Sequence, residues 1–482
     1  MKHLIRLGIA SAFFSMLALF AIASPPGSAP DEPFHIYSGW CFQDETGFCE
    51  TKETFQGSRL IQVPEKWAHA NCYAFYPETS AVCIDDIPKK RITDVAINQG
   101  AYPNGYYALL SVLLGNDEKP NTYDARILIS FLISLIFLAM LYLGAGNGKP
   151  AMWIVPILLL APLPFFLASS LNPSGLAFAL GVLKILLAVR LLDETKRSQE
   201  NRLMFALIAV SLVEIQIRRD SALLFALAII GFFLIHRKTK TPSRRGKIAI
   251  FASVTIALVA AIRNQQVSSA LSGGLGGVSD LSIQTLVIRN FVELPDLYIK
   301  SIVGSLGWND THLFGIANYL PILALGGIFS IAAVFWKRSS RLGILFVGVS
   351  AVAIPITLGV LTAQTFSMQS IQGRYVFPLL VALVAVASPL AISSREIILR
   401  LHTLLNATLA ASLVVSLWIL IWRFSTGLAV EMESVPESLR WWPWPWSPEL
   451  QIFAFSVSAF LFLLLSRLNM KQNLERTHSA LN

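Results

Sequence analysis

The residues best suited to chemistry lie just behind the first apolar segment, where residues 30–35 read Pro-Asp-Glu-Pro-Phe-His. Asp31 and Glu32 supply two adjacent carboxylates, and His35 supplies an imidazole. A carboxylate can take a proton from an acceptor hydroxyl or coordinate a divalent cation. The alternative is a solvated acidic turn between two prolines, because Asp, Glu and Pro are common in loops. The group is a candidate catalytic site, and Asp31 with Glu32 is the candidate metal site.

Three arginines beside apolar segments are candidates for binding a phosphate. Arg374 begins a late apolar segment and is followed by Tyr375, whereas Arg218 and Arg219 lie between two short apolar segments. Charges at membrane depth are costly and usually mark a site or a pathway, and a guanidinium can hold a phosphate through two parallel hydrogen bonds. The alternatives are an interfacial flanking role for Arg374 and a structural ion pair between Arg218 and Glu214, which share one helix face.

Two further polar groups lie in the long stretch after the first apolar segment. Asp85 and Asp86 could form a second carboxylate site, although basic neighbours such as Lys89 also allow simple surface ion pairs. Tyr102 begins a moderately apolar piece, residues 102–114. We expect this piece to lie along a membrane interface, where an aromatic ring is half buried and its hydroxyl stays wet.

The composition indicates which elements must hold these groups. Of the 482 residues, 54% are hydrophobic and 14% are charged, whereas soluble domains are about one-quarter charged. Crossing a bilayer core of ~30 Å takes about 20 helical residues. The sequence therefore predicts an all-α polytopic membrane protein with about twelve transmembrane helices, near residues 4–24, 126–144, 151–170, 173–192, 203–217, 221–235, 248–262, 313–336, 342–362, 375–393, 403–422 and 451–466.

The charge distribution predicts an orientation for these helices. A net charge of +9 would suggest nucleic acid in a soluble protein, but cytoplasmic connections of membrane proteins also collect Lys and Arg. With the N-terminus inside, the short connections and both termini hold 21 of the 38 Lys and Arg residues. We therefore expect cytoplasmic termini, long loops outside, membrane lipids as partners and no nucleic acid. Lys184, inside an apolar segment, is expected to snorkel to the cytoplasmic surface.

The predicted organisation alternates membrane segments with outer loops. The first segment, residues 1–24, is interpreted as a retained helix, although its small-residue end also suits a cleavable signal peptide. The other parts are an outer loop at 25–124, a bundle at 125–262, a second outer loop at 263–312, a second bundle at 313–466 with an outer loop near 423–450, and a cytoplasmic tail at 467–482.

All four cysteines lie in the first outer loop. Their confinement to one segment suggests an oxidising compartment, where thiols pair as disulfides. Of three connectivities, the pairs Cys41–Cys49 and Cys72–Cys83 are the simplest. Zinc is the weaker alternative, because the spacing lacks the short pairs of structural zinc sites.

The motifs and their order resemble the DUF2142 family of bacterial membrane proteins, which are placed among GT-C-type glycosyltransferases. The most specific matches are the acidic motif at 30–35 and the Gln-Gly-Arg-Tyr motif at 372–375. Asn104 departs from the family's pattern, where a second proline is expected. The remaining matches are YPNGYY at 102–107, a segment beginning near Arg126, NPSGLAFALG at 172–181, and GSLGWND at 304–310, which ends in the further candidate Asp310.

The resemblance implies a GT-C-like transferase of the bacterial plasma membrane. Such enzymes use a polyprenyl-phosphate-linked sugar on the extracytoplasmic side, and the acceptor would be a surface or lipid-linked glycan. The family's acidic residue of the first outer loop maps onto Asp31, with Glu32 beside it, and its phosphate-binding arginine maps onto Arg374. The resemblance implies no definite cofactor and leaves a divalent metal ion, held by Asp31 and Glu32, open.

Two other functions also suit many membrane helices with large outer loops. A transporter or flippase of lipid-linked glycans would use the intramembrane charges, but it has no need of a disulfide-bearing outer loop. A polysaccharide polymerase would be expected to carry its main basic residues in a late outer loop. Turnover that consumes the lipid-linked sugar, rather than only moving it, distinguishes a transferase from a transporter.

Overall fold

A computed structural model describes most of the chain. The described residues are 2–42, 49, 51–53, 59–68, 72–88, 90–97, 102–115, 119–144, 151–194, 196–236, 243–263, 281–334, 341–362, 372–387, 395–431 and 440–479.

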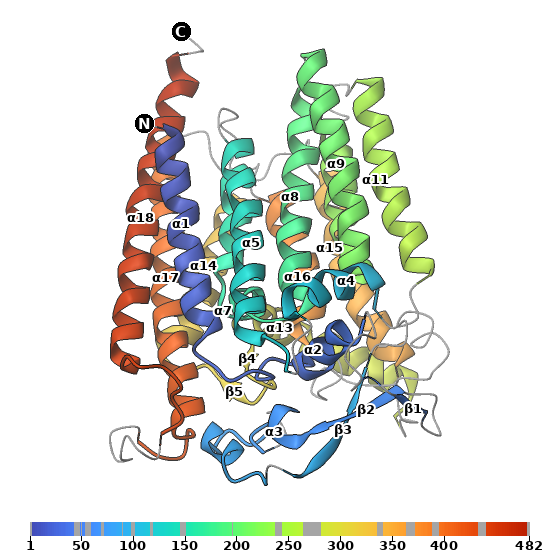
Figure 1. The fold of residues 1–482 in the computed structure, drawn as a ribbon. Coiled ribbons are helices and arrows are strands. Elements are labelled where there is room, and N and C mark those ends of the chain that lie inside the picture. The colour runs from blue at the N-terminus through green and yellow to red at the C-terminus, as the bar shows by residue number, and fades with distance from the viewer. Residues whose placement is uncertain are drawn as a thin grey trace.

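Long helices run side by side through the main body of the molecule (Figure 1). Within the described ranges, eight helices are long and apolar enough to cross a membrane, which confirms the prediction of a helical polytopic membrane protein. These helices are α1 (Lys2–Ala21), α5 (Thr122–Gly144), α8 (Pro173–Asp193), α11 (Arg244–Ile262), α14 (Ile316–Val334), α15 (Arg341–Leu361), α17 (Arg395–Ser425) and α18 (Pro448–Ser479).

Shorter or more polar helices occupy the other predicted spans. They are α6 (Ala151–Ile157) with the 3₁₀ turn η2 (Leu158–Leu160) and α7 (Pro162–Ala168), then α9 (Arg197–Ile217), α10 (Arg219–His236) and α16 (Gly373–Ala387). Every segment predicted to span the membrane therefore contains helix. The predicted tail at 467–482 continues α18 as far as Ser479.

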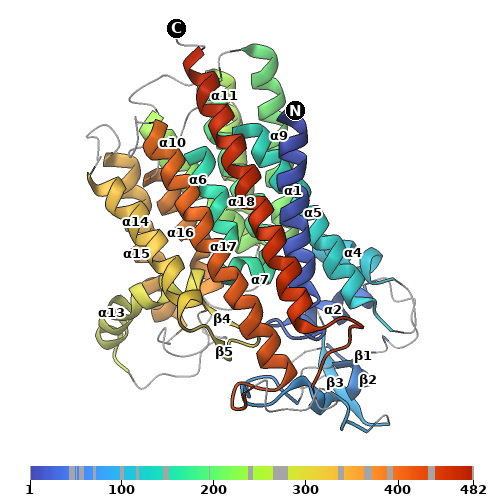
Figure 2. The ribbon, with the colours of Figure 1, turned by 90° about the vertical axis from the view of Figure 1, so that its left-hand side faces the viewer.

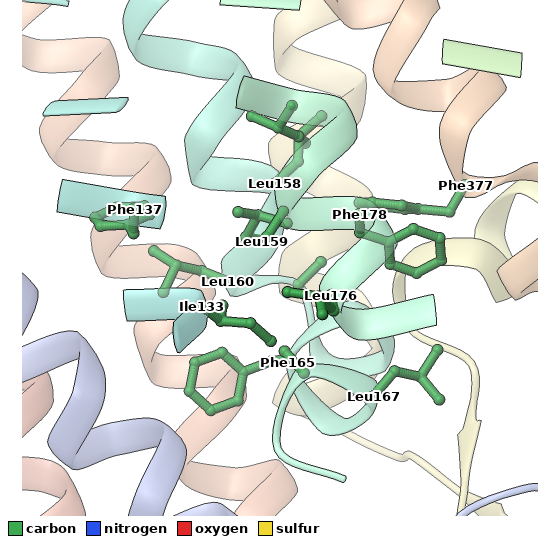
Figure 3. Close-up of a cluster of buried hydrophobic side chains, with 14 of the residues drawn as sticks. Ile133, Phe137, Leu158, Leu159, Leu160, Phe165, Leu167, Leu176, Phe178 and Phe377 are labelled. Carbon is green, nitrogen blue, oxygen red and sulfur yellow. The ribbon is translucent and has the colours of Figure 1, made fainter. Parts of the chain in front are cut away.

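The core of the bundle lies where α5, η2, α7, α8 and α16 meet (Figure 3). Phe178 of α8 packs on Phe377 of α16 with ring centroids 4.6 Å apart, and α8 is buried along most of its length. On another side, α1 packs between α5 and α18, and its Phe13 and Met16 are buried there. In this structure α1 therefore packs as part of the bundle.

The segment predicted to be the first outer loop folds into a small cap at one end of the bundle (Figures 1 and 2). Its sheet is antiparallel in the order β1-β2-β3, with Ile61 of β2 opposite Val95 of β3. Both predicted disulfides, Cys41–Cys49 and Cys72–Cys83, are present. The elements are α2 (Glu32–Trp40), β1 (Thr51–Glu53), β2 (Arg59–Pro64), α3 (Glu65–Ala68), the 3₁₀ turn η1 (Ala81–Ile84), β3 (Ile92–Ala96) and α4 (Asn104–Leu114).

The segment predicted to be the second outer loop contains more regular structure than the sequence suggested. It holds the helix α13 (Ile283–Ile302) and a two-stranded ribbon of β4 (Ser305–Leu306) and β5 (Thr311–His312). α13 packs against α15 and α16 at the end of the bundle that carries the cap (Figure 2). Its apolar residues recur with helical spacing among charged ones, which a search for continuous apolar runs does not detect.

The beginning of α1 and the end of α18 lie at the end of the bundle opposite the cap (Figure 1). We predict that this end is cytoplasmic, because it carries the short basic connections. A cysteine introduced at exposed Lys119, beside the cap, should react with a membrane-impermeant maleimide in intact cells. One introduced at exposed Lys471 of α18 should react only after permeabilisation, and the reverse pattern would invert the orientation.

Candidate functional site

Asp31 lies at the start of α2, at the junction between the cap and the bundle. Its backbone is in the left-handed region, with φ at 60°, which is unusual for a residue other than glycine and often marks a functional position. The side chain is 43% exposed. One carboxylate oxygen accepts a hydrogen bond from Nη2 of Arg374 at 2.5 Å. The structure thus joins the two residues of the most specific motifs.

Arg374 comes from the first turn of α16 and is buried. The preceding Gly373 lets this turn approach α13 closely, since a Cβ there would lie 2.4 Å from the carbonyl carbon of Lys300. The guanidinium also contacts the Tyr375 hydroxyl at 3.4 Å. Its buried Nε has no hydrogen-bond partner among the described residues. Arg374 therefore keeps one donor free beside Asp31.

Arg218 approaches the same place from the junction between α9 and α10. Its guanidinium carbon lies 5.0 Å from the ring centre of Tyr375, and that of Arg374 lies 5.2 Å from the same ring. Asp220 accepts two-point hydrogen bonds from Arg218, and the Ser174 hydroxyl accepts another. The two arginines therefore converge on one tyrosine.

His35 and Tyr102 line the neighbouring side of the site. His35 is fully buried, and its Nδ1 lies 3.0 Å from the hydroxyl of Tyr107. Its ring meets that of Tyr102 edge-on, with centroids 5.0 Å apart. Burial lowers the pKa of His35 to about 3, so the imidazole is neutral at physiological pH. Nε2 of His35 has no hydrogen-bond partner within the described part of the chain.

Asp31 is held in its ionised form. Burial alone would raise the pKa of this carboxyl, but the positive charges of Arg374 and Arg218 outweigh burial and hold the pKa below its ordinary value. Burial raises the pKa of Tyr102 to about 12, so its hydroxyl keeps its proton. The site therefore presents one carboxylate, two guanidinium groups and neutral aromatic walls.

Glu32 points away from this site and is fully buried. Its carboxylate accepts hydrogen bonds from Nε and Nη2 of Arg126 at 2.8 and 2.5 Å. The backbone N–H groups of Ala29 and Leu171 donate to it at 3.2 and 2.9 Å. A cation bound here would face a guanidinium, so the acidic pair does not fit a metal. Within the described ranges, no group of three or more His, Cys, Asp or Glu is arranged to hold one.

Arg126 binds the segment that connects α1 to α2. From the sequence alone, this residue was expected only to begin an apolar segment. All its N–H-bearing nitrogens are hydrogen-bonded: Nε to Glu32, Nη1 to the carbonyls of Ala21 and Ser24, and Nη2 to the Pro25 carbonyl, the Ser28 hydroxyl and Glu32. An arginine near the start of a long apolar helix is the signal that could have revealed it.

Two other matching motifs donate hydrogen bonds to the segment that connects α1 to α2. Asn172 donates from Nδ2 to the carbonyl of Pro30 at 2.8 Å, and Trp308 donates from Nε1 to the carbonyl of Gly27 at 2.8 Å. The motifs at 30–35, 102–107, 172–181, 304–310 and 372–378 therefore meet around one segment.

Three of the candidate acids and one arginine lie apart from Asp31. Asp85 is exposed and pairs with Lys66 at 3.0 Å, and Asp86 beside it is also exposed. Asp310 is buried and accepts a hydrogen bond from Arg423 at 3.1 Å, which links the ribbon of β4 and β5 to α17. Arg219 donates to a backbone carbonyl at the end of α11.

The expectation for Lys184 was wrong, and the alternative of a Glu214–Arg218 ion pair differs from the pairs that the structure contains. Lys184 does not snorkel, because it is fully buried and donates to Glu214 and to the carbonyl of Ala222. Glu214 consequently pairs with Lys184 rather than with Arg218, which uses Asp220 instead. These ion pairs join α8, α9 and α10.

The fold and the site together define a polytopic membrane protein with a paired carboxylate and arginine cluster between its bundle and its cap. The chain belongs to the DUF2142 family of predicted membrane proteins, which it matches over residues 14–383, as its motifs indicated.

Two other comparisons add little. None of the curated proteins compared matches this chain. The crystal structure of ArnT from Cupriavidus metallidurans bound to undecaprenyl phosphate is 12% identical, with an alignment covering 97% of this chain and 77% of that chain and a TM-score of 0.42. A TM-score of 0.42 is below the level that would establish a shared fold.

Proposed function

We propose that this protein is a GT-C-type glycosyltransferase of the bacterial plasma membrane. It moves a sugar from a polyprenyl-phosphate-linked donor to a hydroxyl of a glycan acceptor on the extracytoplasmic side. One observation carries the proposal: the half-exposed carboxylate of Asp31 is paired with the buried Arg374, whose Nε remains without a partner in the described structure. A base and a phosphate-binding cation thus lie side by side.

The arginines suit the departing phosphate. When the bond between the sugar and the phosphate breaks, negative charge accumulates on the phosphate oxygens, and preorganised cations stabilise that charge. Arg374 and Arg218 approach the same Tyr375 ring from α16 and from the α9–α10 junction. A phosphate bound beside this ring would meet both guanidinium groups.

Donor binding would also prepare the base. In the free protein, Asp31 accepts a hydrogen bond from Arg374. A bound phosphate would compete for that donor and release the carboxylate toward the acceptor. Asp31 then takes the proton of the acceptor hydroxyl as its oxygen bonds to the anomeric carbon, and the electron pair of the breaking bond leaves on the phosphate oxygen. A single displacement inverts the anomeric configuration.

His35 and Tyr102 have supporting roles in this scheme. Both are neutral at physiological pH, and Nε2 of His35 has no hydrogen-bond partner among the described residues. A neutral wall leaves Asp31 as the base and the arginines as the anion-binding groups. Glu32 holds the loop through Arg126 and takes no part in proton transfer.

The proposal is tested with purified protein in liposomes and a radiolabelled polyprenyl-phosphate sugar. We expect label to pass to an added envelope-glycan acceptor while free polyprenyl phosphate accumulates. A deletion strain should accumulate the lipid-linked sugar and lose the corresponding surface modification. If the protein moves the labelled lipid between leaflets without consuming it, the transporter function replaces the transferase.

A further inference from the structure

A groove lies between α9 and α11 on the membrane-facing side of the bundle, and the two helices run side by side (Figure 1). Its volume is about 350 Å³. Most of its walls are apolar, and both Leu212 and Val259 are 48% exposed. The lining residues are Leu212, Ile215, Gln216, Arg219, Thr255, Ile256, Val259, Ala260 and Arg263. Such walls suit a hydrocarbon chain lying against the protein.

The end of the groove nearest the cap is positively charged. Arg219 follows the end of α9, and Arg263 caps the end of α11. Nη1 of Arg219 donates to the backbone carbonyl of Arg263 at 2.8 Å, and the side chain of Arg263 is exposed. Among the described residues, the lining includes no carboxylate. The groove therefore combines an apolar trough with two cations at the predicted outer membrane surface.

The charged end adjoins the candidate active site. Gln216 lines the groove and packs against the start of α4, since a Cβ on Gly105 would lie 2.7 Å from Cβ of Gln216. Tyr102, three residues before Gly105, faces His35 in the site. Arg218 directly precedes Arg219 in the sequence, and its guanidinium lies over the ring of Tyr375 in the site. A headgroup held at the arginines of the groove would lie next to this site.

We propose that this groove is the docking position of the lipid-linked donor, an inference that rests on the function proposed above. The isoprenoid chain lies between α9 and α11, and Arg219 and Arg263 bind its phosphate before transfer. From there the headgroup passes beside Gln216 to Arg218 and Arg374. One groove between two helices suits a single chain with an anionic head, because the apolar walls bind the chain and the arginines bind the phosphate.

The test measures binding of undecaprenyl phosphate to the full-length protein in nanodiscs by native mass spectrometry. The double substitution Arg219→Gln with Arg263→Gln should weaken binding at least about tenfold, because two charge-assisted contacts are lost. Thr255→Trp, which fills the trough, should weaken binding to a similar extent. Arg244→Gln, at the opposite end of α11, is the matched control and should bind like the parent.

Binding of the uncharged undecaprenol distinguishes the contribution of the apolar walls from that of the two arginines. This binding should fall in Thr255→Trp and stay unchanged in the double arginine variant. Parental binding of undecaprenyl phosphate by both groove variants at equal folded amount would overturn the proposal. So would an equal loss in Arg244→Gln, or displacement of the probe by an equal concentration of phosphatidylglycerol, which would indicate general attraction of anionic lipids.

The binding readout distinguishes this proposal from the transferase function. Asp31→Asn should bind undecaprenyl phosphate at least as tightly as the parent, because the carboxylate that competes with phosphate for Arg374 has lost its charge. If transfer occurs but the groove variants bind normally, only the groove proposal fails. If the groove variants lose binding but the parent transfers no sugar, the groove stands as a lipid site and the transferase proposal fails.

Discussion

Asp31→Asn should lower sugar transfer by roughly 10²–10⁴-fold while the protein remains folded, because a positioned base contributes about that much. Asparagine has the size of aspartate, and its amide oxygen can still accept the hydrogen bond from Arg374. It has no carboxylate that can accept the proton of the acceptor hydroxyl. Arg374→Lys keeps the charge and loses the planar fork that binds phosphate at two points. This variant should therefore lower the transfer rate at limiting donor, while its abundance in the membrane stays near that of the parent.

Asp86→Asn is the matched control for these variants, because Asp86 is an exposed outer-loop carboxylate away from the site. Initial rates at saturating and limiting donor, measured at equal protein amount, separate loss of the base from loss of donor binding. Parental rates in both Asp31→Asn and Glu32→Gln would contradict carboxylate catalysis altogether.

The same assay gives a pH dependence with a defined sign. The pKa of Asp31 lies below its ordinary value, so the base stays ionised as the pH falls from 8 to 5. Its contribution should be lost only near or below the ordinary carboxyl range of about 4. His35, with its pKa lowered to about 3, does not titrate in this window. An inflection near pH 6.5 that disappears in His35→Gln would show that the imidazole titrates after all.

Arg126→Lys should destabilise the protein by about 3 kcal/mol or more, because several buried acceptors lose their donor at about 1–3 kcal/mol each. A lysine ammonium has three donors on one nitrogen and cannot reach the acceptors that Arg126 joins on both sides of the loop. Glu32→Gln should destabilise by a comparable amount, because it leaves the buried guanidinium uncompensated. Thermal unfolding in detergent, with membrane abundance, measures both effects.

Arg91→Lys is the control for Arg126→Lys, because Arg91 is largely exposed and makes a single ion pair with Glu65. The distinction between Glu32 and Asp31 lies in the readout. Glu32→Gln should lose stability, and Asp31→Asn should lose transfer at unchanged stability. A Glu32→Gln variant with parental stability and no transfer would return the role of base to Glu32.

The membrane class, both disulfides and the family could be predicted from the residues alone. Long apolar runs predict spanning helices because each helix satisfies its own backbone hydrogen bonds and is driven into the bilayer by its own side chains. The pairs Cys41–Cys49 and Cys72–Cys83 close short loops, so their partners are near in sequence. Asp31 and Arg374 were recognised as candidates because each lies in a distinctive motif.

Which charges meet was decided by the packing of the helices. Glu32 and Asp31 are adjacent in the sequence, yet one is bound by Arg126 inside the protein and the other faces Arg374 at the surface of the site. Lys184 pairs with Glu214 on a neighbouring helix, and Arg219 contacts the end of α11 whereas Arg218 contacts Tyr375. An apolar run in the sequence indicates that one helix is buried, without reference to any other helix. A buried charge must have a partner, because an isolated buried ion is too costly. Which partner it finds depends on how the helices are rotated and placed against each other.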